Sequence, residues 1–504
     1  MVGKTLQIIL VILLFWLEAK LCDSWPLSTR SRWIIEESSG DRYKLKCVNW
    51  AGHLQAMIAE GLDKKPSKQI ARQVVSNGFN CVRLTWATHM FTRYSNLTVA
   101  QSLDCLGLKE AMAGVVKNNA LLLNRTLVDA YEIVVDDLGF YNIAVVLDNH
   151  VSEPKWCCRD DDGNGFFGDQ NFDPNEWLQG LTAVANRFKD KPMVVGMSMR
   201  NELRGPSQNE NDWYQYMMEG ATAIHAKNPN VLVIVSGLVY DTDLSFLKRR
   251  PMGSNLNHKL VYEAHWYSFS ERPPEKWLVQ PLNQVCANAT QRFINLAGFL
   301  VQGQNPVPLF VSEFGVDQRG VNRADNCFLG CFLALITEMD LDWALWALQG
   351  SYYLRDGLIG PDEPYGLLDV NWAHLRNPDF LERLQLIQQT LQDQKLEVLK
   401  YYIMYHPASG HCVQVEKEEI CASDCRSWSR WSHNGDGTPI WLMGTSWCLK
   451  AEGDGLPVIL SLDCSSEQSR WEFASSSKFQ IAAKDENGRS LCIRLEFSQL
   501  FKNH

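Results

Sequence analysis

Short apolar segments alternate with amphipathic segments along most of this chain. The apolar segments have the length of buried strands, and the amphipathic segments carry apolar residues at helical spacing. The eight predicted strands are residues 43–49, 80–86, 143–149, 194–201, 231–236, 260–265, 309–313 and 341–346. Predicted helices between them include residues 126–138, 175–188, 212–226 and 326–339. Regular alternation is typical of a parallel α/β fold, and eight repeats favour a closed (β/α)8 TIM barrel over an open sheet.

Two regions depart from this alternation. Residues 87–125 separate the second and third strands by more than an ordinary connection, and we predict an elaborated loop there. After about residue 400 the helical patterns give way to Gly, Ser and six Cys, in three similar units of about 40 residues. The chain therefore predicts an α/β barrel domain at residues 23–398 and a small all-β domain at residues 399–504. Because no Pro- or Ser-rich linker separates them, we expect the two domains to pack together.

The N-terminus has the pattern of a secretory signal peptide. Lys4 precedes an apolar run at residues 8–17, and charged residues end that run. Ten apolar residues are too few to span a bilayer, so we predict a cleaved signal at residues 1–22. No later segment is apolar over about 18 residues. We expect a secreted protein, extracellular or in the cell wall, with no membrane anchor.

Cysteines and glycosylation sequons agree with secretion. The chain has 15 Cys, and removal of Cys22 with the signal leaves an even number suited to disulfides in an oxidising compartment. Three sequons begin at Asn96, Asn124 and Asn288 and are candidate glycosylation sites.

Composition narrows the classes of partner. Hydrophobic residues make up 46% and charged residues 21%, as in globular proteins, and the formal net charge is −10. An acidic chain without basic runs argues against a nucleic-acid or anionic-membrane surface. Eighteen Trp supply aromatic faces on which sugar rings can stack, although most single Trp side chains are core residues. We expect a monomer whose partner is a polysaccharide or glycoside substrate.

Two predicted strands end in glutamate. The fourth strand finishes at Glu202 and the seventh at Glu313. The ends of TIM-barrel strands carry the chemistry, and an unpaired buried carboxylate is costly. Either acid alone could be a salt-bridged structural residue, but two facing one cavity are what glycosidic cleavage requires. One carboxyl stays protonated for the leaving oxygen, and the other attacks the anomeric carbon.

Other strand ends offer supporting side chains. Arg83 can keep a catalytic carboxylate ionised and oriented, and Asn201 can hydrogen-bond the sugar 2-hydroxyl. Further hydrogen bonds and a platform beneath the sugar are expected from His150, His265, Tyr267 and Trp346. A lone His or Trp is more often structural, and the shared position at one rim reverses that preference.

Residues 30–395 resemble glycoside hydrolase family 5, the cellulase-like retaining family. The matching motifs are Cys47-Val-Asn-Trp-Ala-Gly, Val82-Arg83-Leu, Leu147-Asp-Asn-His150, Asn201-Glu202, Tyr262-Glu-Ala-His265-Trp-Tyr267, Ser312-Glu313-Phe-Gly and Leu345-Trp346. The resemblance implies that Glu202 is the acid/base, that Glu313 is the nucleophile and that no cofactor or metal is needed. Leu203 departs from the Pro that usually follows the acid/base, which affects the expected subsite shape.

The segment after the third strand partly imitates a calcium loop. Its alternating ligand types are Asp160, Asp162, Asn164 and Gly165. The twelfth position is Asn171, so the bidentate Glu is missing. We favour a loop that is pinned by Cys157 or Cys158 beside the active-site mouth.

Residues 400–504 resemble a degenerate ricin B-type lectin β-trefoil. The resemblance implies the disulfides Cys412–Cys425 and Cys448–Cys464, each of which closes one lobe. Sugar-binding lobes of that family usually carry Asp two residues after the opening Cys. This chain has Gln414, Lys450 and Arg494 there, so we expect weak or no lectin activity.

The sequence thus predicts a secreted, plant-type retaining β-glycoside hydrolase. Its expected substrate is a β-linked glucan or mannan, cleaved by endo or exo action. Two alternatives stay open: a catalytically inactive carbohydrate-binding protein, and a retaining hydrolase of a glycolipid or small glycoside. Loop shape sets substrate choice on this barrel, so a hydrolysis screen separates these possibilities.

Overall fold

The computed structural model describes residues 25–253, 256–271, 273, 275–392 and 401–493. The predicted signal peptide, the predicted domain boundary at residues 398–399 and Arg494 lie outside these residues. The chain forms two compact units. The first comprises the described part of Met1–His265 with Leu296–Phe314 and Asp342–His374, and the second comprises the rest.

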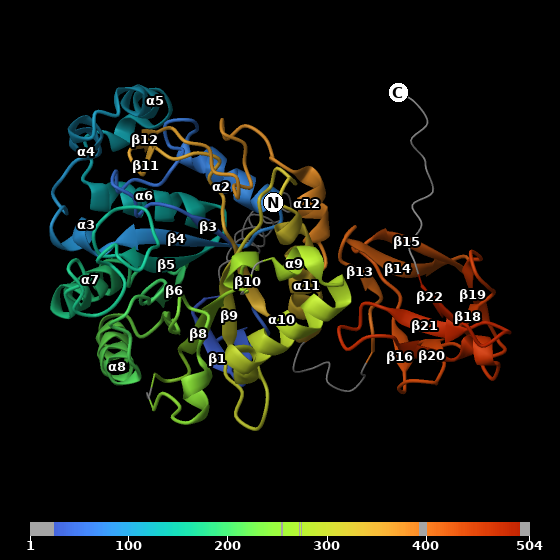
Figure 1. Ribbon diagram of the computed structural model, residues 1–504. Coiled ribbons are helices and arrows are strands. Elements are labelled where there is room, and N and C mark those ends of the chain that lie inside the picture. The colour runs from blue at the N-terminus through green and yellow to red at the C-terminus, as the bar shows by residue number, and fades with distance from the viewer. Residues whose placement is uncertain (1–24, 254–255, 272, 274, 393–400, 494–504) are drawn as a thin grey trace, which may run out of the picture. The chain divides into compact units, whose positions relative to one another are not determined.

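The first unit contains a closed parallel barrel of eight strands (Figure 1). These are β3 (Lys46–Trp50), β4 (Cys81–Ala87), β5 (Ala144–Val151), β6 (Val194–Ser198), β7 (Leu232–Val235), β8 (Leu260–His265), β9 (Leu309–Phe314) and β10 (Asp342–Leu345). Strand β10 pairs with β3 and closes the barrel. All eight strands overlap the predicted ones, so the fold class expected from the alternation is confirmed: an α/β barrel followed by all-β sheets.

Apolar residues on the inner face of the strands explain the barrel. Val146, Leu232, Ile234 and Phe310 are fully buried in one cluster. The disulfide Cys47–Cys81 joins β3 to β4 near the N-terminal ends of these strands. A hairpin of β1 (Leu27–Arg30) and β2 (Trp33–Glu36), which the sequence pattern did not predict, adds Leu27 and Ile34 to the same cluster.

Three of the predicted helices lie in the first unit, as α6 (Leu127–Phe140), α7 (Pro174–Arg187) and α8 (Glu210–Lys227). The fourth, predicted at residues 326–339, is α11 (Arg323–Met339) of the second unit, and α2 (Ser67–Ser76) was not among the predicted helices. The prediction of a loop over residues 87–125 is wrong, because that stretch contains α3 (Thr88–Thr92), α4 (Val99–Cys105), α5 (Lys109–Asn119) and η2 (Ala120–Leu122). Helices α3 and α4 span only five and seven residues, and α5 buries only Ala111 and Val115, so all three leave a weak periodic signal. The remaining short elements of this unit are η3 (Ser245–Lys248), η5 (Gly298–Val301), β11 (Leu354–Arg355) and β12 (Leu358–Ile359).

The second unit combines helices with three antiparallel sheets. Its helices are η4 (Ser268–Ser270), α9 (Lys276–Val279), α10 (Leu282–Leu296), α11 (Arg323–Met339) and α12 (Pro378–Arg383). The disulfide Cys286–Cys331 joins α10 to α11. Lys478 of the C-terminal part forms an ion pair with Glu338 of α11, and Asn283 of α10 donates to Gln480.

The sheets of the second unit follow the repeat seen in the sequence. The first sheet has β13 (Tyr405–His406), β14 (His411–Glu416) and β15 (Glu419–Asp424). The second has β16 (Trp431–His433), β17 (Ile440–Leu442), β18 (Cys448–Ala451) and β19 (Val458–Ser461). The third, after η7 (Glu467–Ser469), has β20 (Trp471–Phe473), β21 (Ile481–Lys484) and β22 (Ser490–Cys492). Trp431, the first residue of β16, and Trp471, the first residue of β20, are buried in one shared apolar cluster.

The structure pairs ten cysteines. Cys412–Cys425 and Cys448–Cys464 are the pairs that the resemblance implied. Four described cysteines stay unpaired, so the even count did not translate into complete pairing: Cys105, Cys327, Cys421 and Cys492. No helix in the described part of the chain combines the length and apolar character that crossing a membrane requires.

Candidate active site

The two predicted catalytic acids lie together at the end of the barrel strands. Glu313 is the fifth residue of β9, and Glu202 follows the end of β6 by four residues. A carboxylate oxygen of each lies within 4.8 Å of the other and of a His265 ring nitrogen. Glu202 and Glu313 are both largely buried, with side chains 15% and 6% exposed. The closed barrel thus brings two acids from distant segments to one point.

His265 connects the two acids. It is the last residue of β8 and pairs in register with Glu313 of β9. Its Nδ1 atom lies 2.9 Å from Oε1 of Glu202 and 3.7 Å from Oε2 of Glu313. Burial lowers the pKa of His265, so the neutral ring is favoured. A neutral ring that carries its proton on Nδ1 donates to Glu202 and orients that carboxyl.

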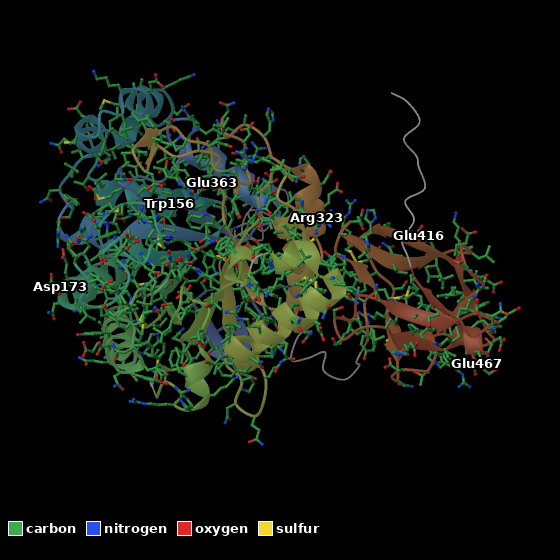
Figure 2. All side chains as sticks on the ribbon, viewed as in Figure 1. Trp156, Asp173, Arg323, Glu363, Glu416 and Glu467 are labelled. Carbon is green, nitrogen blue, oxygen red and sulfur yellow. A yellow bond between two sulfur atoms is a disulfide. The ribbon has the colours of Figure 1, made fainter. Side chains whose placement is uncertain are left out.

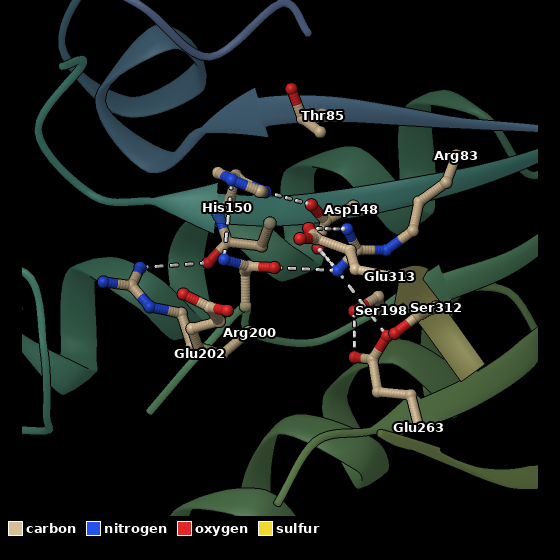
Figure 3. Close-up of polar contacts among 12 residues, drawn as sticks. Arg83, Thr85, Asp148, His150, Ser198, Arg200, Glu202, Glu263, Ser312 and Glu313 are labelled. Atoms are coloured by element: carbon tan, nitrogen blue, oxygen red, sulfur yellow. Dashed lines mark hydrogen bonds and ion pairs between the residues drawn. The ribbon is translucent and has the colours of Figure 1, made fainter. Parts of the chain in front are cut away.

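Arg83 of β4 lies at the centre of a buried polar network (Figure 3). Its Nη1 donates to Glu313 at 2.9 Å and to Asn49 at 3.0 Å, and its Nη2 donates to Asp148 at 2.9 Å and Asn201 at 3.0 Å. Arg83 is fully buried, and the surrounding acids raise its pKa, so the guanidinium stays charged. The planar fork of Arg suits this four-partner role, because it fixes several acceptors at once.

Both acids titrate well above the range of exposed carboxyls. Burial raises the pKa of Glu202 to about 7 and that of Glu313 to about 7. The charge of Asp148 raises both pKa values further, and the charge of Glu202 adds to the rise at Glu313. Of the two acids, Glu313 accepts a hydrogen bond from Arg83, and this contact favours the ionised form of Glu313.

The backbone of Glu202 has a left-handed conformation, with φ of 45°. Such values are uncommon outside Gly and persist where surrounding groups fix them. Asp241 accepts the Glu202 amide at 3.0 Å, and Arg204 donates to the Glu202 carbonyl at 2.7 Å. Asp241 and Arg204 are fully buried. Two buried side chains thus hold the backbone that aims the Glu202 carboxyl.

Asn201, His150 and Trp346 complete the cluster that the sequence predicted. Nε2 of His150 lies 3.4 Å from the amide nitrogen of Asn201. Nδ1 of His150 is hydrogen-bonded to Oδ2 of Asp148 at 2.6 Å. Burial lowers the pKa of His150 well below its usual range. Trp346 stacks on His150 with ring centres 5.4 Å apart and an angle of 17° between the planes. Both rings lie within the first unit, beside the polar network around Arg83.

Among the predicted catalytic and substrate-binding residues, Tyr267 alone lies in the second unit. It follows β8 by two residues, is buried, and stacks on Phe269 with ring centres 4.7 Å apart. Its contribution to a sugar site stays a prediction.

Several polar residues of the network were missed in the sequence. They are Asn49, Asp148, Arg204, Asp241 and Glu263. Asp148 and Glu263 lie inside β5 and β8, and Glu263 accepts from Ser198 and lies 3.5 Å from Arg83. A charged residue within an otherwise apolar strand was the available signal, because a buried charge needs a partner.

The segment that imitates a calcium loop uses its oxygens on protein groups. Asp162 forms a 2.5 Å ion pair with Arg204, and Asn164 accepts the amides of Ser152 and Glu153. Asp160 accepts from Tyr240. These hydrogen bonds and the ion pair fix the loop in place.

The cysteines of this segment bond to each other. The prediction that Cys157 or Cys158 pins the loop is wrong, because the disulfide joins these two neighbours and ties the loop to no other segment.

Three side chains at the site present atoms of the kind that coordinate a cation. Glu202, His265 and Glu313 present their ligand atoms within 4.8 Å of one another. The Arg83 guanidinium, 2.9 Å from Glu313, opposes a second positive charge there. The arrangement suits proton transfer and nucleophilic attack better than metal binding.

Comparison with known proteins agrees with this arrangement. Residues 42–351 match the family model for cellulase (glycosyl hydrolase family 5). The chain is 46% identical over 508 residues to a "Glycosyl hydrolase 5 family protein" of Chamaecyparis obtusa, an alignment that covers 98% of this chain and 91% of the relative. It is 21% identical over 355 residues to an endoglucanase of Paenibacillus polymyxa, covering 66% of this chain and 82% of the relative.

Solved structures show the same fold. The catalytic domain of the major endoglucanase of Xanthomonas campestris pv. campestris superposes with a TM-score of 0.60 at 20% identity, over 72% of this chain and 99% of that domain. An endocellulase from Pyrococcus horikoshii, whose complexes with cellotetraose are also known, gives 0.60 at 18% identity over 73% and 99%.

Proposed function

The chain belongs to glycosyl hydrolase family 5 and is a glycosidase that hydrolyses O-glycosyl compounds, and from that premise we propose a retaining β-glucanase. The separation of the two acids carries this proposal. Retaining enzymes place their carboxyl groups about 5–5.5 Å apart, whereas inverting enzymes leave about 6.5–9.5 Å for a water molecule. Oxygens of Glu202 and Glu313 within 4.8 Å of each other support the retaining arrangement.

The residues take their roles from their surroundings. Glu313, ionised beside Arg83, attacks the anomeric carbon and forms a covalent glycosyl-enzyme. Glu202, which holds the proton, delivers it to the glycosidic oxygen so that the leaving sugar departs. Glu202 then takes a proton from a water molecule that attacks the anomeric carbon, and the Glu313 carboxylate is released. Two inversions at that carbon give net retention.

Other residues beside the two acids bind the substrate. Asn201 is placed to donate from its amide to the sugar 2-hydroxyl, because its oxygen is already held by Arg83. Trp346, stacked on His150, offers a ring face beneath the reacting sugar. Stacking on an aromatic face and a 2-hydroxyl bond that strengthens in the transition state together hold the substrate.

A β-glucan is the favoured substrate. Relatives that carry the name endoglucanase match most of the barrel, and cellotetraose binds to a protein of the same fold. The proposal is tested by NMR of the products from a soluble β-glucan. Release of the β-anomer first supports retention, whereas initial α-anomer contradicts it. A parallel screen on mannan, xylan and aryl β-glycosides checks the substrate, and absent glucan hydrolysis would overturn it.

Secretion is part of the proposal. Disulfides such as Cys47–Cys81 form in oxidising compartments, and the sequon residues Asn96, Asn124 and Asn288 are exposed. These features support export and glycosylation of the enzyme. A shift in mass after N-glycosidase treatment of the protein recovered from the medium tests both.

The C-terminal sheets support a structural role for a degenerate trefoil. The Gln414 amide donates to Ser423 and to the Asp424 carbonyl, while its oxygen accepts from Ser427. Lys450 lies 3.5 Å from Asp463. Side chains at these positions are engaged within the protein, which supports a module without lectin activity.

A further inference from the structure

Adjacent cysteines form a disulfide in the loop that follows β5. Cys157 and Cys158 are bonded to each other, and Cys157 packs in an apolar cluster with Ala87 and Val151. Cys157 is 8% exposed and Cys158 is more exposed. The bond encloses no chain segment, so it does not cross-link distant parts of the fold as the other disulfides do. Its chemical contribution is the surface that its two sulfur atoms present.

That surface lies against the catalytic acid. One sulfur of each cysteine and a carboxylate oxygen of Glu202 lie within 4.8 Å of one another. The amide nitrogen of Asn201 lies 3.6 Å from the sulfur of Cys157 and 3.8 Å from that of Cys158. The disulfide therefore lies within 4.8 Å of the carboxyl that is proposed to donate the proton, and it contacts the Asn201 amide that is proposed to bind the 2-hydroxyl.

The chemistry of this position defines what it can bind. A general acid must stand within hydrogen-bond distance of the oxygen that it protonates, so atoms of the leaving group lie beside Glu202 during the reaction. A disulfide carries no charge and no donor, and its polarisable sulfurs suit contact with the C–H face of a pyranose ring. A dithiol would instead place two titratable groups beside the acid.

We infer that the Cys157–Cys158 disulfide forms a subsite for the leaving-group sugar of the β-glucan, an inference that rests on the proposed function. It contacts the ring whose oxygen Glu202 protonates. The subsite gives the acid an apolar neighbour, which agrees with the burial that raises the Glu202 pKa.

Other contacts hold the loop in place. The ring of Trp156, which is labelled in Figure 2, lies under the Arg355 guanidinium, 3.5 Å from its centre, and 5.5 Å from the Tyr352 ring. Arg204 donates to the Arg159 carbonyl at 3.0 Å. Because these contacts do not involve the disulfide, a variant without it can keep the loop conformation.

The test compares two reactions of the full chain in the C157A/C158A variant. The first is kcat/KM for cellotetraose, which requires a sugar in the leaving-group site. The second is kcat for 2,4-dinitrophenyl β-cellobioside, which is limited by hydrolysis of the glycosyl-enzyme after the leaving group has gone. The ratio of the two does not depend on how much of the preparation is folded. We expect this ratio to fall about fivefold or more, the effect of losing one good apolar contact.

The matched control removes a disulfide of the C-terminal sheets, in C448A/C464A, and should keep the wild-type ratio. Equal losses of both reactions in C157A/C158A, with an unchanged ratio, would show a purely structural bond and overturn the inference. Failure of the wild-type protein to cleave either substrate would instead contradict the proposed function.

Discussion

Nη1 of Arg83 donates a 2.9 Å hydrogen bond to Oε1 of Glu313, and both side chains are buried. The same guanidinium reaches Asp148 through Nη2 at 2.9 Å. One positive charge thus offsets acids from two strands, which makes Arg83 both a structural counter-ion and the group that keeps the nucleophile ionised.

Replacement of Arg83 by Met should lower both stability and activity. Removal of one partner from a buried ion pair leaves uncompensated charge, and we expect the free energy of unfolding to fall by about 3–5 kcal/mol at pH 7. The loss should shrink at pH 5, where the orphaned carboxyls can protonate. Urea unfolding at both pH values measures this. R93M is the control, because Arg93 pairs with Glu176 at the surface and such pairs contribute about 0–1 kcal/mol.

The two glutamates should respond differently to truncation. E313A should lose nearly all turnover, and azide should restore it with formation of an inverted glycosyl azide, because azide occupies the space of the nucleophile. E202A should retain turnover of substrates with good leaving groups, which need little proton donation. Kinetics with aryl β-glycosides of graded leaving-group pKa provide the measurement. The opposite pattern would exchange the two roles.

Activity should fall on the alkaline side of neutrality. Glu202 acts as an acid only while protonated, and burial raises its pKa to about 7, so kcat/KM should drop about tenfold per pH unit above that value. The sign for stability is the reverse of an ordinary ion pair. Because the pKa of Glu202 is higher in the folded protein than the 4.5 of the unfolded chain, Glu202 does not lower the free energy of unfolding below pH 4.5. Above about pH 7 its full destabilising effect is present. E202Q should therefore raise the melting temperature relative to wild type at pH 8 and have little effect at pH 4. A melting-temperature difference independent of pH would count against this assignment.

Asp241 should act as a positioning residue for Glu202. It accepts the Glu202 amide at 3.0 Å, and its Oδ2 lies 3.6 Å from Nε2 of His265. D241A leaves that amide without its partner, a loss of about 1–3 kcal/mol. We expect kcat to fall about 5- to 150-fold with a smaller change in KM. Burial raises the pKa of Asp241 well above its usual range, so Asn is a close substitute for the neutral acid. D241N should recover most of the loss, and equal defects in both variants would exclude this role.

The C-terminal sheets should bind simple sugars weakly. Gln414 forms hydrogen bonds with Ser423, Ser427 and Asp424 of the protein itself, and Lys450 offers only donors. Calorimetry of the full chain with lactose should give a Kd in the millimolar range or weaker. The E313A background removes any contribution from turnover. A micromolar Kd would show that a sugar site exists in these sheets.

Much of the barrel could be predicted because its signal is local. Strands such as β5 and β9 are buried along their whole length, so their apolar runs mark them in the sequence. The acids at Glu202 and Glu313 interrupt that apolar pattern at strand ends. The helices α3 to α5 escaped prediction, because α3 and α4 span only five and seven residues and α5 buries only Ala111 and Val115.

Tertiary structure decided which residues form hydrogen bonds and disulfides with each other. Nothing near Asp241 in sequence indicates that it holds the amide of Glu202, 39 residues earlier. The bond between Cys157 and Cys158, likewise, could not be distinguished from a bond to a distant cysteine. The sequence by itself determined the eight-stranded alternation and the two acids, since periodicity records burial residue by residue. Only the closed barrel decided which buried polar groups meet, because each hydrogen bond depends on the positions that distant strands take when the last strand, β10, pairs with the first, β3.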